Sequence, residues 1–152
     1  MERIKNDELP DGMMQALYAT QSFLNKSGLS KTLVNLINMR VSQLNSCGFC
    51  LDMHSKEAVS AGETMQRLIA LPAWREASFY TPAERAALAH AEFLTRLDGH
   101  TDISPVYAEL EQHFSKEEIS LVTLAVMQIN SWNRLVRTTG REAGSYQVGA
   151  HG

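Results

Sequence analysis

The chain has 152 residues, of which 44% are hydrophobic and 20% charged, and its formal net charge is −3. It is long enough for one domain with its own core, and the acidic balance without lysine or arginine runs argues against nucleic-acid binding. The polar first residues contain no apolar signal segment, and no uncharged run approaches the roughly 20 residues of a membrane span. We therefore expect one cytoplasmic domain over residues 1–152, with neither nucleic acid nor membrane as a partner.

Helix signals dominate the first half of the chain, and strand alternation is nearly absent. Apolar spacing predicts a first helix over about residues 11–25. Ser30 is a good N-cap for a second helix that runs to Leu44. The β-branched residues of this segment could suit a strand, but the run is long and its spacing fits a buried helix better. We expect Ser46 to cap a third helix that begins at Cys47 and ends near Gly62.

The second half of the chain contains clear helix start and stop signals. A short helix over residues 63–71 is expected to end at Pro72. Capping boxes with the Ser/Thr-x-x-Glu pattern and other terminal signals delimit three more helices. These signals are Thr81–Glu84, which opens a helix to about Leu97, then Ser104–Pro105, Ser115–Glu118 and Gly140. We predict an all-α fold of six or seven helices, with a core over about residues 10–140 and a tail, 141–152, that is mobile unless a neighbouring subunit holds it.

The most informative motif is formed by Cys47, Cys50 and His54, which include the chain's only two cysteines. Residues three and four apart are neighbours on a helix surface, so the three side chains would share one face. One helical turn also meets the α-carbon separation of about 4.4–6.8 Å that a disulfide needs. Because disulfides are rare in the cytoplasm, such a pair is more often catalytic or metal-binding than structural. The spacing predicts a redox site.

The chemistry of such a site depends on forming a thiolate, the nucleophilic form of cysteine. Cys47 would lie in the first helical turn, where unpaired N–H groups favour an anion. His54, one turn beyond Cys50, could take up its proton. After attack on a hydroperoxide, Cys50 would become a sulfenic acid that the neighbouring thiol condenses to a disulfide. We assign Cys50 as the attacking residue, Cys47 as the resolving residue and His54 as the base.

Other interpretations of the motif are weaker. Two inert core cysteines in a structural or interaction module remain possible, since free cysteine is a common buried residue. A structural zinc ion usually takes four ligands, and His90, His100 and His113 provide no second clustered pair. Covalent haem does not fit because Leu51 follows Cys50, and no βαβ pattern supports a thioredoxin-like fold.

The chain resembles the alkylhydroperoxidase D-like group of the carboxymuconolactone decarboxylase superfamily from about residue 10 to residue 137. The resemblance is carried by the Cys-x-x-Cys-x-x-x-His motif within residues 41–56, and by segments 73–76, 81–88 and 129–135. It implies an all-helical homo-oligomer, trimeric or hexameric, that reduces hydroperoxides without haem, flavin or metal. It also implies an external dithiol reductant, in some members lipoyl-linked, and supports the assignment of the three motif residues. The decarboxylase branch lacks the cysteine pair.

Two positions depart from the family pattern. Where many members have a relay glutamate, twelve residues before the first cysteine, this chain has Asn35, which cannot take up a proton at neutral pH. A histidine that precedes the second cysteine in some members is here Phe49. We keep Asn35 as a candidate relay residue and expect Asp52 and Glu57 to lie off the catalytic stripe, on a solvated face. A thiol–disulfide exchanger or redox sensor with little peroxidase activity is the alternative function.

Overall fold

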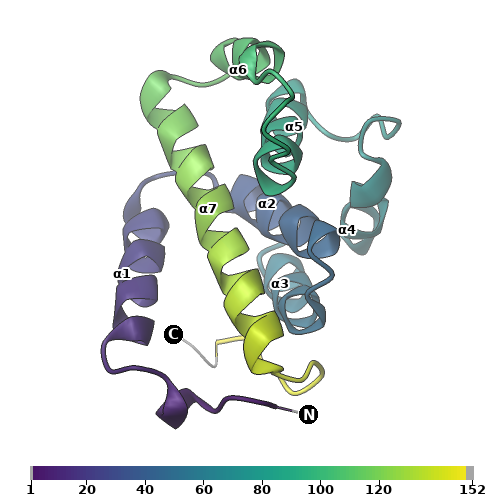
Figure 1. Ribbon diagram of the computed structural model, residues 1–152. Helices are drawn as coiled ribbons and strands as arrows, with labels where there is room; N and C mark the ends of the chain where they lie inside the picture. Colours follow the sequence, from purple (N-terminus) through teal and green to yellow (C-terminus); the bar gives the residue numbers. More distant parts are fainter. Residues whose placement is uncertain (1, 150–152) are drawn as a thin grey trace.

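The computed structural model describes residues 2–149, and every regular element in that range is a helix (Figure 1). The elements are a 3₁₀ turn at Asn6–Glu8, α1 (Met13–Lys26), α2 (Lys31–Leu44), α3 (Gly48–Ser60), α4 (Met65–Ala70), a 3₁₀ turn at Leu71–Ala73, α5 (Pro82–Thr95), α6 (Ser104–Glu111) and α7 (Lys116–Thr139). The predicted all-α fold is confirmed. No helix among the described residues is both long and apolar enough to cross a membrane.

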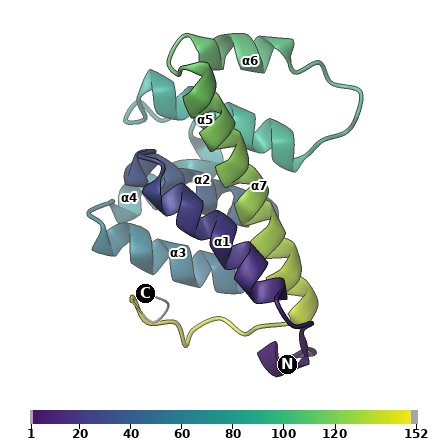
Figure 2. The same ribbon diagram turned by 90° about the vertical axis from the view of Figure 1, so that its left-hand side faces the viewer.

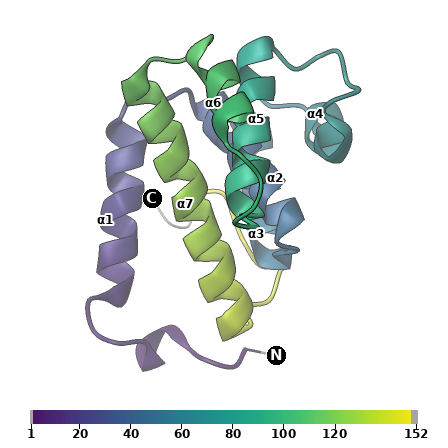
Figure 3. The same cartoon turned by 45° about the horizontal axis from the view of Figure 1, so that its top comes forward.

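Helix α2 is central to the arrangement and contacts α3, α5 and α7. The long α7 crosses in front of α2, and α1 packs on the other side of α7 (Figures 1 and 3). The main core forms between α2, α5 and α7. Its fully buried members include Ile37, Val41, Ala87, Ala91 and Val122. Because α2 is covered on several sides, its apolar residues serve two clusters: Leu33, Ile37 and Val41 lie in the main core, and Leu36 and Met39 lie in a second one.

Several helix ends follow directly from local sequence. The side chains of Thr81 and Glu84 satisfy each other's backbone N–H groups at the start of α5, and Ser115 and Glu118 do the same for α7. Gly140 ends α7 with a left-handed φ of 77°, a conformation that glycine adopts without steric cost. These termini lie where the capping patterns predict them.

The start of α3 differs from the prediction. Cys47, rather than Ser46, occupies the N-cap position, so the helix begins at Gly48. Ser46 has a positive φ of 51°, which turns the chain sharply and lets the Cys47 N–H donate to the Ser42 carbonyl at 3.0 Å. Ser46 is therefore part of the α2–α3 turn and cannot serve as the extended residue that caps a helix.

The tail, which was expected to be mobile unless a neighbouring subunit holds it, contacts α3. Residues 141–149 run back along α3 (Figure 2), and Tyr146 is buried with 5% of its surface exposed. The Lys56 ammonium donates to the Tyr146 carbonyl at 3.0 Å, and the Gly144 N–H donates to the Asp52 carboxylate at 3.0 Å. Helix α3 thus provides this segment with contacts from the same chain. The final part of the expected tail, 150–152, lies outside the described residues.

Candidate redox site

The two cysteines meet at the N-terminus of α3. Cys47 is the N-cap residue and Cys50 lies in the first turn, and their Sγ atoms form a disulfide with a Cα–Cα distance of 5.3 Å. This separation is within the range that a disulfide requires. Both residues are buried, with 0% and 1% of their surface exposed. The pairing expected from the spacing is present, although Cys47 precedes the helix instead of belonging to it.

The position of Cys47 has a consequence for thiol chemistry. An N-cap side chain lies beside the unpaired N–H groups of the first helical turn, where the helix dipole favours a negative charge. A thiolate on Cys47 would be stabilised from this direction, as in other helix N-terminal cysteines. Cys50 instead lies one helical turn from His54, whose imidazole could accept its proton. The two sulfur atoms therefore experience different stabilising groups.

A buried amide network holds the turn that positions Cys47. Asn133 of α7 is fully buried and donates to the Ser42 hydroxyl at 3.1 Å. The Asn45 amide donates to the side-chain oxygens of Asn133 and Asn130, at 3.0 Å in each case. Asn133 thus lies in the core, and its partners show that it anchors the α2–α3 turn to α7.

His54 is largely buried, and its ring contacts a carboxylate that belongs to the same helix. Its Nδ1 atom lies 3.1 Å from Oε2 of Glu57. With the proton on Nδ1, this nitrogen donates to the carboxylate and Nε2 keeps the free lone pair that a general base needs. Glu57 can therefore fix the tautomer in which the outer nitrogen accepts a proton.

The His54 ring also lines a small cavity of about 10 Å³ between α1, α2, α3 and α7. Its lining includes the amide side chains of Gln21, Asn38 and Gln128 and the indole of Trp132. A volume of this order matches a single water molecule. On α2 it is Asn38, one turn after Asn35, that faces this cavity. Asn35 is half-buried and is not among the lining residues, so the structure does not bring it to His54 there.

The outer face of α3 carries the residues that were expected to be solvated. Asp52 forms an ion pair with Lys56 at 2.8 Å. The Lys56 hydrogen bond, followed by the Gly144 N–H, lowers the pKa of the Asp52 carboxyl. Phe49, at the second family departure, is buried against the Tyr146 ring, and the Arg141 guanidinium lies 4.3 Å from the Phe49 ring centre. This face of α3 is a docking surface for the tail.

Sequence reasoning missed two residues of the site, Glu57 and Tyr146. Glu57 lies three positions after His54, a spacing that places two side chains within reach on a helix, so its role was visible in principle. The Tyr146 hydroxyl donates to Oε1 of Glu57 at 2.6 Å. No local pattern marks Tyr146, because its contact spans 89 positions in the sequence.

His90 and His113 lie outside the motif helix α3. The His90 Nε2 atom contacts the Thr123 hydroxyl at 2.9 Å in the α5–α7 interface, and His113 contacts Glu109 on α6. Among residues 2–149, no three His, Cys, Asp or Glu side chains are grouped closely enough to hold a metal ion. The chemistry that this geometry supports is carried by two sulfur atoms and an imidazole.

Comparison with known proteins places this site in a family context. A sequence profile described as the carboxymuconolactone decarboxylase family matches residues 7–93. The uncharacterised protein YdfG of Bacillus subtilis (strain 168) is 35% identical over 144 residues, covering 95% of this chain and 98% of YdfG. The crystal structure of ATU0492 from Agrobacterium tumefaciens, named as a candidate AhpD antioxidant defence protein, has a TM-score of 0.88 and 32% identity, covering 96% of this chain and 100% of that one.

A more distant structure shares the fold alone. The debrominase Bmp8 has a TM-score of 0.77 and 21% identity, covering 86% of this chain and 70% of that one. The family match and the full-length similarity to ATU0492, together with the joined cysteine pair, support a redox function. The chain belongs to the carboxymuconolactone decarboxylase family, as an AhpD-like member of that superfamily.

Proposed function

We propose that the protein is a thiol-dependent hydroperoxide reductase that cycles between a dithiol and a disulfide. The observation that carries this proposal is the disulfide between Cys47 and Cys50 at the start of α3, with His54 one turn further along the same helix. The Glu57 carboxylate contacts Nδ1 of His54, which leaves Nε2 on the other side of the ring able to accept a proton. The AhpD name of a full-length structural relative points to the same class of reaction.

The proposed reaction balances with these groups and one external reductant. His54 accepts the Cys50 proton, and the thiolate attacks the terminal oxygen of the hydroperoxide, breaking the O–O bond. Cys50 becomes a sulfenic acid, and the departing alkoxide takes a proton from His54 to leave as an alcohol. The Cys47 thiol then displaces water from the sulfenic acid and forms the disulfide. An external dithiol restores both thiols by exchange and leaves as its own disulfide.

The burial of both cysteines bears on the choice of reductant. A sulfur atom that is almost fully covered is reached more readily by a slender chain than by the face of a second folded protein. A lipoyl group, which presents a dithiol at the end of a long narrow arm, suits this geometry. We propose a dithiol of this kind as the partner; the cycle as written uses no bound cofactor.

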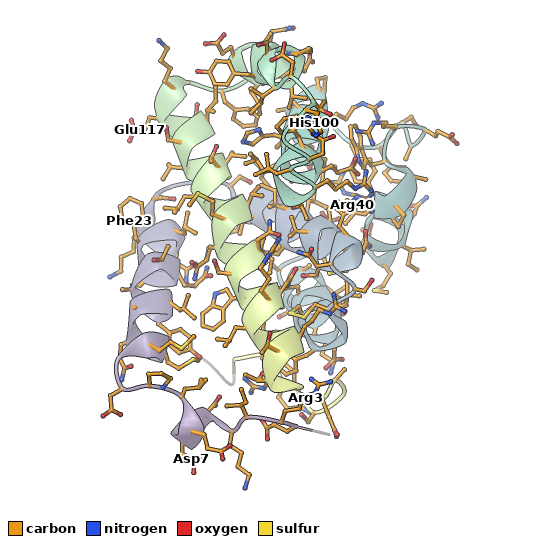
Figure 4. The ribbon with its side chains drawn as sticks, in the orientation of Figure 1. Arg3, Asp7, Phe23, Arg40, His100 and Glu117 are labelled. Atoms are coloured by element: carbon orange, nitrogen blue, oxygen red, sulfur yellow. A yellow bond between two sulfur atoms is a disulfide. The ribbon has the colours of Figure 1, made fainter. Side chains whose placement is uncertain are left out.

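We also propose that the protein acts as a homo-oligomer, trimeric or hexameric, as the family resemblance implies. Two aromatic side chains of α1, Tyr18 and Phe23, are exposed by 45% and 58%, and Phe23 points away from the bundle in Figure 4. Large exposed aromatic residues are typical of protein interfaces. Sedimentation of the purified chain tests this directly, and a monomer at micromolar concentration would contradict it.

The experiment that tests the reaction compares wild type with Cys50→Ser and His54→Gln in a dihydrolipoamide-coupled assay. The compounds tested are hydrogen peroxide, cumene hydroperoxide and 2,3,4-tribromopyrrole, the last because a variant of the debrominase with this fold binds it. We expect peroxide-dependent dithiol oxidation that Cys50→Ser abolishes and His54→Gln lowers by roughly 10²-fold or more, as loss of a general base does. Equal peroxide turnover in wild type and Cys50→Ser would reject the proposal, and bromide release without peroxide turnover would redirect it.

Thiol–disulfide exchange or redox sensing is the second candidate, and one observation favours it. Cys47 occupies the N-cap position of α3, where the helix terminus promotes a thiolate independently of His54. In an exchange protein Cys47 would attack first. Rapid reaction of the reduced protein with oxidised lipoamide or glutathione, combined with peroxide rates no faster than those of a free thiol, would favour this function.

A further inference from the structure

We propose that Tyr146 is a positioning residue of the redox site, which acts on His54 through the carboxylate of Glu57. This inference deepens the proposed function, since it concerns the residue that serves there as the base. It connects the C-terminal segment, residues 141–149, with the redox site on α3.

The geometry is a chain of two hydrogen bonds through one carboxylate. The Tyr146 hydroxyl donates to Oε1 of Glu57 at 2.6 Å. The other oxygen of the same carboxylate, Oε2, lies 3.1 Å from Nδ1 of His54. Each oxygen thus has its own partner, so the carboxylate plane cannot rotate without losing one of them. Tyr146 therefore fixes the rotamer of Glu57 and, through it, the ring of His54.

The tail is attached at several points, which holds the Tyr146 ring in one place. The ring packs edge-on against Phe49, with centroids 6.5 Å apart and an interplanar angle of 85°. The Tyr146 carbonyl accepts from Lys56, and the backbone two residues earlier donates to Asp52. All three α3 residues lie within one and a half turns of Cys50 or His54. Several independent contacts therefore fix the position of the Tyr146 ring.

The hydroxyl stays protonated, as a donor must. Burial, reinforced by the Glu57 carboxylate, raises the pKa of Tyr146 to about 12. Loss of the hydroxyl should free the Glu57 carboxylate to rotate away from His54, so the imidazole should lose part of the contact that selects its Nδ1–H tautomer. Replacement of Glu57 should have the same effect to a larger extent.

The other groups that face His54 do not obscure this effect. Toward α1, α2 and α7 the ring meets the cavity lined by the neutral amides of Gln21, Asn38 and Gln128. On the tail side, the Lys56–Asp52 pair is mutually neutralised. The Glu57 carboxylate is the charged group in direct contact with the ring.

The test compares Tyr146→Phe and Glu57→Gln with wild type by two measurements. The first is kcat/KM with cumene hydroperoxide. The second is the pair of ¹⁵N chemical shifts of the His54 ring in the reduced protein, which report the tautomer and require no activity. We expect kcat/KM to fall by roughly tenfold in Tyr146→Phe and by more in Glu57→Gln, because both weaken the contact that orients the ring. In both variants the Nδ1 and Nε2 shifts of His54 should move toward each other, as a mixture of tautomers gives. Tyr107→Phe on α6, a half-buried tyrosine remote from α3, is the matched control and should leave both measurements unchanged.

The outcomes separate this proposal from the proposed function. If wild type lacks peroxide turnover but both variants still move the His54 ¹⁵N shifts, the positioning role stands and the peroxidase function fails. If Tyr146→Phe changes only the melting temperature and leaves the His54 ¹⁵N shifts as in wild type, Tyr146 is merely structural and the proposal is wrong. The Phe variant keeps the ring that packs on Phe49, so it retains the apolar part of the tail contact.

Discussion

The Asn45 amide donates to the Asn133 side-chain oxygen at 3.0 Å, and this contact connects the α2–α3 turn with α7. Asn133 passes the connection on by donating to the Ser42 hydroxyl at 3.1 Å. The turn includes Ser46, whose left-handed backbone precedes Cys47. The position of the first sulfur atom thus depends on a polar residue from a helix far away in the sequence.

Replacing Asn133 by Leu tests the importance of this network. The variant removes one of the two partners of the half-buried Asn45 amide and leaves the buried Ser42 hydroxyl without its amide donor, and one unsatisfied buried group costs about 1–3 kcal/mol. We expect the free energy of unfolding in urea to fall by roughly 1–3 kcal/mol. Ser131→Ala, an exposed position on the same helix, should change it by less than about 0.5 kcal/mol. Equal effects of the two substitutions would show that the network does not contribute to the free energy of unfolding.

A second buried polar cluster surrounds Glu92 on α5, where α2 and the segment after α4 meet it. Its carboxylate accepts from Arg40 at 2.6 Å, from the Trp74 indole at 2.9 Å and from Arg75 at 2.8 Å. Burial raises the pKa of Glu92, but the bonds from Arg75, Trp74 and Arg40 outweigh it and lower the pKa overall. The carboxylate is therefore charged in the folded protein at neutral pH.

Glu92→Gln should destabilise the protein by about 3 kcal/mol or more at pH 7, because Arg40 is left as an uncompensated buried charge. A lowered folded-state pKa contributes stability above the unfolded value of 4.5, and that stability is lost as pH falls through the folded value. The difference between wild type and Glu92→Gln should accordingly shrink below about pH 4.5. Urea titrations at several pH values measure this, with exposed Glu111→Gln as the control. A pH-independent difference would contradict the charge-based explanation.

We expect His90 to give the stability of the folded protein a different pH dependence. It is 2% exposed, its Nδ1 atom has no hydrogen-bond partner among the described residues, and burial lowers its pKa from 6.5. The unfolded chain therefore binds a proton below pH 6.5 that the folded protein resists, so stability falls as pH drops from there toward the folded value. His90→Leu should reduce this acid slope by up to about 1.4 kcal/mol per pH unit. Exposed His100→Gln should leave the slope as it is, and an unchanged slope in His90→Leu would show that His90 is not its origin.

Much of the fold could be predicted because its signals are local. The capping boxes at Thr81 and Ser115 and the C-terminal Gly140 each act within one helical turn, and all three helix ends are where the patterns place them. The cysteine pair was predictable for the same reason, since a spacing of three residues brings two side chains together at the start of a helix.

What could not be predicted depends on contacts between distant segments. Ser46 looks like a good N-cap, but the left-handed turn it forms is stabilised by α7 residues that are remote in sequence. The tail has little apolar periodicity, yet Tyr146 is buried because Glu57 and Phe49 receive it. Glu57 was expected on a solvated face because helical geometry places it off the Cys50–His54 stripe. Its side chain is 37% exposed, and its carboxylate also meets the tail at Tyr146.

The different surroundings of the two sulfur atoms allow a final prediction about their roles. If Cys50 attacks the peroxide with His54 as its base, Cys47→Ser should still react once and stop at a sulfenic acid, because no resolving thiol remains. Mass spectrometry after dimedone labelling should then find one adduct per chain, on Cys50, with no steady-state turnover. Cys50→Ser should give neither adduct nor turnover. An adduct on Cys47 in Cys50→Ser, formed as fast as that on Cys50 in Cys47→Ser, would mean that the helix N-terminus rather than the imidazole selects the nucleophile.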